Sequence, residues 1–141
     1  MRLAFLYAGQ GSQHVGMGKD LYEANAAFRQ VLDSVDPGFD VKKICFEGPD
    51  EVLTQTQYTQ PCMVAFAAGV TAALYERGIR PEMAAGLSLG EYSALCAAGV
   101  FDAKTAVDLV AFRGKAMAEA VQDRPSAMAA GPMLGSEGLQ K

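Results

Sequence analysis

The stretch Gly86-Leu87-Ser88-Leu89-Gly90 places the strongest constraint on the fold of this chain. It matches the G-x-S-x-G pattern, in which a serine lies at a sharp turn between a strand and a helix. The residues two before and two after the serine must be small, because the strand and the helix would otherwise collide. Gly86 and Gly90 meet that requirement. The pattern therefore predicts a strained turn that projects the Ser88 hydroxyl outward, and the alternative is an ordinary tight turn with a capping serine.

A helix that begins after Ser88 would supply hydrogen-bond donors as well as a turn. Helix starts carry free N–H groups and a partial positive charge, and the N–H of Leu89 would point to where an oxyanion forms. A second donor in such sites comes from the loop of a different strand. The loop Gly9-Gln10-Gly11 follows an apolar run and could supply that donor from Gln10. A nucleotide loop is disfavoured, because His14 stands where the dinucleotide fingerprint requires its third glycine.

Apolar runs and breakers divide the chain into alternating strands and helices. Residues 41–47 are ambiguous between a helix and a strand. Strands are expected over 3–7 and 82–85, and longer helices over 21–35, 59–77, from after 88 to 99, and 103–122. This alternation predicts an α/β fold with a parallel sheet. Two or three strands are fewer than a parallel sheet usually has, so the chain resembles part of a sheet protein.

Arg113 falls within an apolar stripe of the helix expected over 103–122. The i, i+3, i+4 rule places it at the centre of that stripe. A guanidinium there can extend to water, pair with a buried carboxylate, or wait for an anionic ligand, and these residues alone favour a structural ion pair. Gly114 weakens the helix and indicates close packing or ligand approach. The other members of the expected stripe are Ala106, Leu109, Val110, Ala116, Met117 and Ala120.

Charge, cysteine usage and hydropathy exclude several classes of protein. The net charge is −4 with scattered basic residues, which does not indicate a nucleic-acid surface. The three cysteines include no C-x-x-C pair, and a single histidine cannot complete a zinc site. We expect buried, reduced thiols in a cytoplasmic protein with no metal or cofactor. The longest apolar run, 62–74, is too short for the ~20 residues of a membrane span, and no signal peptide is visible.

Four stretches occur in the chain in this order: GQGSQ at 9–13, YTQP at 58–61, GLSLGEYSAL at 86–95 and RGKAM at 113–117. Together they resemble the malonyl-CoA:acyl carrier protein transacylase family and the related acyltransferase domains of polyketide and fatty-acid synthases. The resemblance covers the chain to about residue 130 and corresponds to the N-terminal half of the family only. It implies a partial, parallel-sheet α/β-hydrolase-like core over 1–125 and the start of a small ferredoxin-like subdomain over 126–141.

The resemblance also implies roles for individual residues. Ser88 would be the nucleophile that receives the malonyl group from malonyl-CoA and passes it to acyl carrier protein in fatty-acid biosynthesis. The N–H groups of Gln10 and Leu89 would form the oxyanion hole. Arg113 would hold the free carboxylate of the malonyl group, which would explain its position in an apolar stripe.

Two departures from the family bear on activity. The family usually has histidine where this chain has Leu87, which alters local packing more than chemistry. The family's catalytic histidine lies well downstream of the serine, and this chain ends before it. We expect the chain to be inactive alone, as a truncated product or one half of a split enzyme, and to associate with the missing half or with itself. His14 is not expected to substitute, because the family uses a different position.

Two other functions remain open from the sequence. The same turn could serve a serine hydrolase that transfers the acyl group to water. The chain could also be a non-catalytic fragment that acts as a binding or assembly element. Arg113 favours the acyltransferase over a simple esterase, since an esterase needs no residue to hold a carboxylate. The choice between malonyl and methylmalonyl groups, the oligomeric state and the docking surface for the carrier protein stay open.

Overall fold

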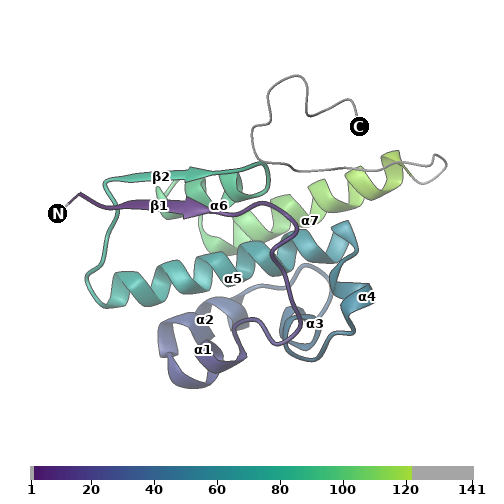
Figure 1. Cartoon of the computed structure of the whole chain (residues 1–141), viewed down its shortest axis with the longest axis horizontal. Helices are drawn as coiled ribbons and strands as arrows, with labels where there is room; N and C mark the ends of the chain where they lie inside the picture. The colour runs from purple at the N-terminus through teal and green to yellow at the C-terminus, as the bar shows by residue number, and fades with distance from the viewer. Residues whose placement is uncertain (1, 122–141) are drawn as a thin grey trace, which may run out of the picture.

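Two strands and seven helices make up residues 2–121, the part of the chain that this computed structural model describes. The expected alternation of strands and helices is confirmed, and the fold is α/β (Figure 1). The ferredoxin-like subdomain expected over 126–141 lies outside the described residues. In chain order the elements are β1 (Ala4–Tyr7), α1 (Lys19–Ala24), α2 (Ala26–Ser34), α3 (Val41–Glu47), α4 (Asp50–Leu53), α5 (Thr56–Glu76), β2 (Met83–Gly86), α6 (Gly90–Ala97) and α7 (Ala103–Ala120).

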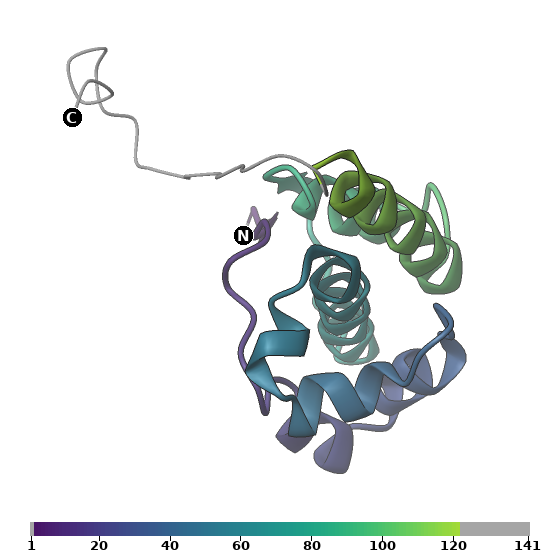
Figure 2. The same ribbon diagram turned by 90° about the vertical axis from the view of Figure 1, so that its right-hand side faces the viewer.

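The sheet lies on one side of a central helix. β1 and β2 pair in parallel, with Ala4 opposite Met83 and Tyr7 opposite Gly86. Helix α5 runs beneath the sheet. Helix α7 packs along α5, and α1–α4 lie on the side of α5 that faces away from the sheet (Figures 1 and 2). Cys62, Val64 and Ala65 of α5 are fully buried, as the nearly continuous apolar sequence of this helix predicts. No helix within residues 2–121 combines the length and apolar character that crossing a bilayer requires.

Helix boundaries differ from the expectation at two places. The single helix expected over 21–35 is divided at Asn25, whose backbone is extended and whose side chain accepts a 2.8 Å hydrogen bond from the Phe28 N–H. Asn25 thus caps a new helix instead of continuing the old one. Helix α5 begins at Thr56 and not near residue 59, because the Gln55 carbonyl already accepts from two N–H groups of the first turn.

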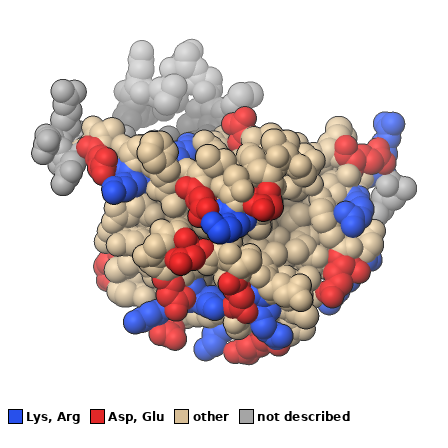
Figure 3. All heavy atoms as spheres, turned by 180° about the vertical axis from the view of Figure 1, so that it is seen from behind, with Lys and Arg blue, Asp and Glu red and all other residues tan. Residues whose placement is uncertain are grey.

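Residues 41–47, ambiguous from the sequence, form helix α3. The Asp40 side chain accepts a 3.1 Å hydrogen bond from the Lys43 N–H and so caps this helix. The same kind of cap starts α7, where the Asp102 carboxylate accepts from the Thr105 N–H at 2.7 Å, directly before the helix expected from residue 103. On the face seen in Figure 3, acidic and basic side chains are interspersed, without a continuous basic surface.

One face of the sheet is open to solvent. Phe5 and Tyr7 of β1 point towards α5, whereas the alternate residues form what we call the outer sheet face: Ala4, Leu6, Met83 and Ala85. Leu6 is 80% exposed and Met83 63% exposed. Parallel sheets are normally covered on both faces. The described residues therefore leave an apolar surface that favours association.

We expect the 141-residue chain to self-associate through the outer sheet face. Burying Leu6 and Met83 between two copies removes apolar surface from water. Sedimentation velocity should give a mass above the 14.9 kDa of one chain. Leu6→Lys should shift the population towards monomer, and Leu109→Lys, on the exposed side of α7, should not. A compact monomer at all concentrations would contradict this expectation.

Candidate active site

Ser88 occupies a strained backbone conformation between β2 and α6. Its φ is 51°, and it is the one non-glycine residue of 2–121 with a positive φ. β2 ends at Gly86 and α6 begins at Gly90, so the turn contains three residues. A left-handed conformation in a residue other than glycine costs about 1–3 kcal/mol and persists only where the surroundings enforce it. The strained strand-to-helix turn expected from the sequence is confirmed.

The two glycines of the motif permit backbone contacts that no larger residue would allow. A Cβ on Gly86 would collide with the Gly90 carbonyl, so the strand and the helix touch directly. A Cβ on Gly90 would collide with the Tyr7 carbonyl oxygen and would lie 2.9 Å from the Ala8 carbonyl oxygen. The first contact follows from the motif. The second joins α6 to the end of β1, far away in the sequence.

The loop after β1 runs past this turn. A Cβ on Gly9 would lie 3.0 Å from the Leu87 carbonyl oxygen, and the Gln10 side chain donates a 3.1 Å hydrogen bond to the Thr56 hydroxyl. Within residues 2–121, neither the Gln10 N–H nor the Leu89 N–H makes a hydrogen bond. Leu89 has a helical backbone and is 1% exposed. Both amides are therefore unoccupied donors in adjoining segments, and their joint action as an oxyanion hole stays a prediction.

Arg113 of α7 reaches the serine. Its Nη2 donates a 3.2 Å hydrogen bond to the Ser88 Oγ, and its Cζ lies 5.7 Å from the centre of the Tyr92 ring. The ring face attracts the cation and restrains its position. The sequence analysis did not find Tyr92 as a site residue, although Tyr92 follows Ser88 by four residues and extends one turn into α6.

The structural ion pair favoured for Arg113 is not formed within residues 2–121. No carboxylate among residues 2–121 lies within 4.0 Å of its guanidinium. The side chain is half-buried, so it has access to solvent and to Ser88 without a paired acid. The positive charge beside the serine is therefore available to an anionic ligand.

The expected apolar face of α7 is also partly wrong. Leu109 is 42% exposed, and Ala116 and Ala120 are exposed too. The buried face instead contains Ala106, Val107, Val110 and Gly114. A Cβ on Gly114 would lie 2.8 Å from the Thr56 carbonyl oxygen, so this glycine lets α7 pack closely on the first turn of α5. That contact rotates Arg113 from the centre of the stripe to its border, next to Ser88.

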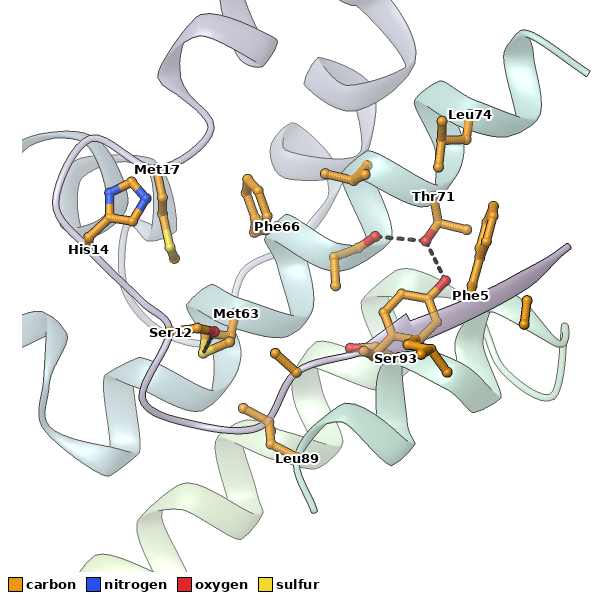
Figure 4. A pocket seen from close by; sticks show the side chains of 16 residues that line it. Phe5, Ser12, His14, Met17, Met63, Phe66, Thr71, Leu74, Leu89 and Ser93 are labelled. Atoms are coloured by element: carbon orange, nitrogen blue, oxygen red, sulfur yellow. Dashed lines mark hydrogen bonds between the residues drawn. The ribbon is translucent and has the colours of Figure 1, made fainter. Parts of the chain in front are cut away.

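His14 makes no hydrogen bond with Ser88. It lines a cavity of about 370 Å³ between β1 and α5, together with apolar side chains such as Met17, Met63 and Phe66, and Ser88 is absent from that lining (Figure 4). The His14 Nδ1 lies 3.2 Å from the neighbouring Val15 carbonyl oxygen. The position of His14 supports no role as the base of the serine.

The same cavity contains one buried polar pair. The hydroxyls of Tyr7 and Thr71 lie 2.8 Å apart, within hydrogen-bond distance. Burial raises the pKa of Tyr7 above its ordinary value, so the phenol stays neutral and structural at physiological pH.

The cysteines are unpaired, and two of them are buried as expected. Cys45 and Cys62 belong to the core, and Cys96 is half-buried. A hydrogen bond with Cys45, together with burial, raises the pKa of the Cys62 thiol. A thiol held in its protonated form is a poor nucleophile, so Cys62 does not compete with Ser88.

Comparisons with known proteins show the family of this chain. The family model described as "Acyl transferase domain" matches residues 4–135. The malonyl CoA-acyl carrier protein transacylase of Bacillus subtilis is 44% identical over 142 residues, which include 99% of this chain and 45% of the relative. The Escherichia coli protein of that name is 40% identical, covering 92% of this chain and 43% of the relative. The chain thus spans less than half the length of these curated relatives.

Solved structures give the same result for the fold. The malonyl CoA-acyl carrier protein transacylase of Clostridium perfringens superposes with a TM-score of 0.80 at 40% identity, over 86% of this chain and 39% of that one. A malonyl-transacylase solved in complex with its type II polyketide acyl-carrier protein gives a TM-score of 0.81 at 41% identity, over 86% and 40% of the two chains. The chain therefore belongs to the malonyl CoA-acyl carrier protein transacylase family, whose common element is the acyl transferase domain.

Proposed function

We propose that this chain carries the nucleophile of an acyltransferase that moves a malonyl group from malonyl-CoA to acyl carrier protein in fatty-acid biosynthesis. The observation that supports this most directly is the 3.2 Å contact between the Arg113 guanidinium and the Ser88 Oγ. It places beside a strained serine a cation that has no carboxylate partner among residues 2–121. We further propose that the α/β fold is part of an α/β-hydrolase-like core, as the strand–serine–helix turn suggests.

The proposed reaction has two transfers through an acyl-enzyme. The Ser88 Oγ attacks the thioester carbonyl, the new O–C bond forms, and the C–S bond breaks with its electron pair going to the CoA sulfur. The serine proton passes through a general base to that sulfur. The phosphopantetheine thiol of the carrier protein then reverses these steps and takes the malonyl group. The N–H groups of Gln10 and Leu89 would donate to the carbonyl oxygen while it carries negative charge.

Arg113 would choose the acyl group. A malonyl group has a free carboxylate that acetyl lacks, and the planar guanidinium can donate two parallel hydrogen bonds to it. The Tyr92 ring behind the guanidinium holds it in place. A simple esterase gains nothing from such a cation, so this residue favours the acyltransferase over a serine hydrolase.

The general base would come from outside the 141 residues of this sequence. The one hydrogen bond of the Ser88 side chain within residues 2–121 comes from Arg113, which cannot accept a proton. The sequence has one histidine, and it lines another cavity. We therefore propose that an imidazole supplied by a complementary acyltransferase segment activates Ser88, and that the chain alone transfers the acyl group poorly.

Intact-mass spectrometry after exposure to malonyl-CoA tests the nucleophile. We expect a malonyl adduct that maps to Ser88 when a complementary segment is present, a much weaker adduct without it, and none in Ser88→Ala. Addition of phosphopantetheine-loaded carrier protein should discharge the adduct onto its thiol. Discharge to water alone would favour the hydrolase. A complete lack of adduct with the complementary segment would favour a non-catalytic fragment that binds or assembles.

A further inference from the structure

Gln60 of α5 has a buried acceptor with no partner. Its side chain is fully buried, and its Oε1 makes no hydrogen bond within residues 2–121. Its Nε2 donates to the Met117 sulfur of α7 at 3.4 Å, which is a weak acceptor. An unpaired acceptor in the interior destabilises the folded chain, so such groups are rare unless they have a use. The Gln60 Oε1 therefore requires a hydrogen-bond donor in the α5–α7 interface.

Arg113 has donors to spare in the same interface. A guanidinium carries five N–H bonds, and within the described residues Arg113 uses one, towards the Ser88 Oγ. Met117, which touches Gln60, follows Arg113 by one helical turn, so their side chains share a face of α7. Gly114 brings this part of α7 against Thr56 and Gln57, the turn of α5 that precedes Gln60. The α5–α7 interface thus contains both the Gln60 Oε1, which lacks a donor, and the Arg113 guanidinium, which has unused donors within the described residues.

We propose that Gln60 is a positioning residue for Arg113. When a substrate carboxylate draws the guanidinium away from Ser88, the Gln60 Oε1 accepts one of its N–H bonds and orients the remaining donors towards the carboxylate. The movement also frees the Ser88 Oγ for attack. This inference rests on the proposed function, because it assigns Arg113 to the carboxylate of the acyl group.

Gln60→Leu separates positioning from packing, since it removes the acceptor and keeps most of the volume. Calorimetric titration of the 141-residue chain with malonyl-CoA and acetyl-CoA measures the contribution of the carboxylate. We expect Gln60→Leu to weaken malonyl-CoA binding roughly 10-fold, the scale of a hydrogen bond to a charged group, and to leave acetyl-CoA binding nearly unchanged. The thermal midpoint should rise, because the unpaired acceptor is gone. Gln60→Met, with a flexible side chain, should behave in the same way.

Gln57→Leu is the matched control, on the same helix and with its side chain amide bonded to Gln55 at 3.4 Å. It should change neither affinity. Arg113→Ala, titrated in parallel, distinguishes a failure of the proposed function from a failure of the role of Gln60. If the wild-type chain shows no preference for malonyl-CoA over acetyl-CoA, the proposed function is overturned and this inference with it. The same holds if the preference survives Arg113→Ala. A preference that needs Arg113 but survives Gln60→Leu overturns the role of Gln60 alone. Equal weakening of both ligands with a lower thermal midpoint shows a packing role and also overturns it.

Discussion

Replacing Gly90 by alanine is expected to destabilise the chain by about 3 kcal/mol or more, because the new methyl group has no space. Its Cβ would overlap the Tyr7 carbonyl oxygen and approach the Tyr7 carbonyl carbon to 2.8 Å. These are backbone atoms, and they cannot move independently of the sheet. The same Tyr7 carbonyl accepts a 3.1 Å hydrogen bond from the Leu87 N–H. Relief of the collision would therefore separate β1 from the turn that carries Ser88.

Urea denaturation followed by circular dichroism measures this loss. Gly38→Ala is the matched control, since Gly38 has a φ of 91° and no atom within 4 Å of its would-be Cβ. That variant has no collision and should lose only about 1–2 kcal/mol, the cost of a left-handed conformation in a residue with a side chain. If Gly90→Ala had the same urea midpoint of unfolding as the wild type, the prediction that α6 directly contacts β1 at Gly90 would be refuted.

Replacing Arg113 by alanine is expected to remove the preference for malonyl over uncharged acyl groups. In the chain combined with its complementary segment, kcat/KM for malonyl transfer should fall roughly 100-fold, within the range of about 2–5 kcal/mol for breaking a desolvated charge pair. Acetyl transfer should persist, because acetyl has no carboxylate for the guanidinium to hold. Arg113→Ala also removes the 3.2 Å hydrogen bond to the Ser88 Oγ, so the guanidinium no longer occupies that oxygen.

Competition between malonyl-CoA and acetyl-CoA in one reaction measures the preference directly. Arg113→Lys provides the control, since it keeps the charge but loses the planar fork that binds a carboxylate with two hydrogen bonds. It should retain part of the preference. Equal losses of malonyl and acetyl transfer in Arg113→Ala would refute the role of Arg113 in selecting the acyl group.

Features that depend on neighbouring residues could be predicted from the sequence. The left-handed turn at Ser88 needs only small residues two positions away on either side. The start of α7 needs only a carboxylate at Asp102, placed to accept from the Thr105 N–H. The continuous helix expected over 21–35 is wrong for a reason that is also local, because the Asn25 side chain caps a new helix by accepting from the Phe28 N–H.

Features that depend on packing between distant segments could not be predicted. The ion pair expected for Arg113 assumed an apolar face centred on that residue, but the direction of α7 is set where Gly114 meets the first turn of α5. The Gln60 Oε1, buried without a hydrogen-bond partner in the described residues, also lies between α5 and α7, and no periodicity within either helix encodes this position.

The sequence by itself determined the strained serine that precedes a helix, the alternation of helices with strands of a parallel sheet, and the family to which the chain belongs. Backbone sterics and capping specify these over a few neighbouring residues. Only the tertiary structure decided that Arg113 meets Ser88 and pairs with no acid of the described residues, that Gly90 touches β1, and that Gln60 lies beside Met117. These contacts join residues far apart in the chain, and close packing of whole helices against α5 and the sheet determines which side chains meet.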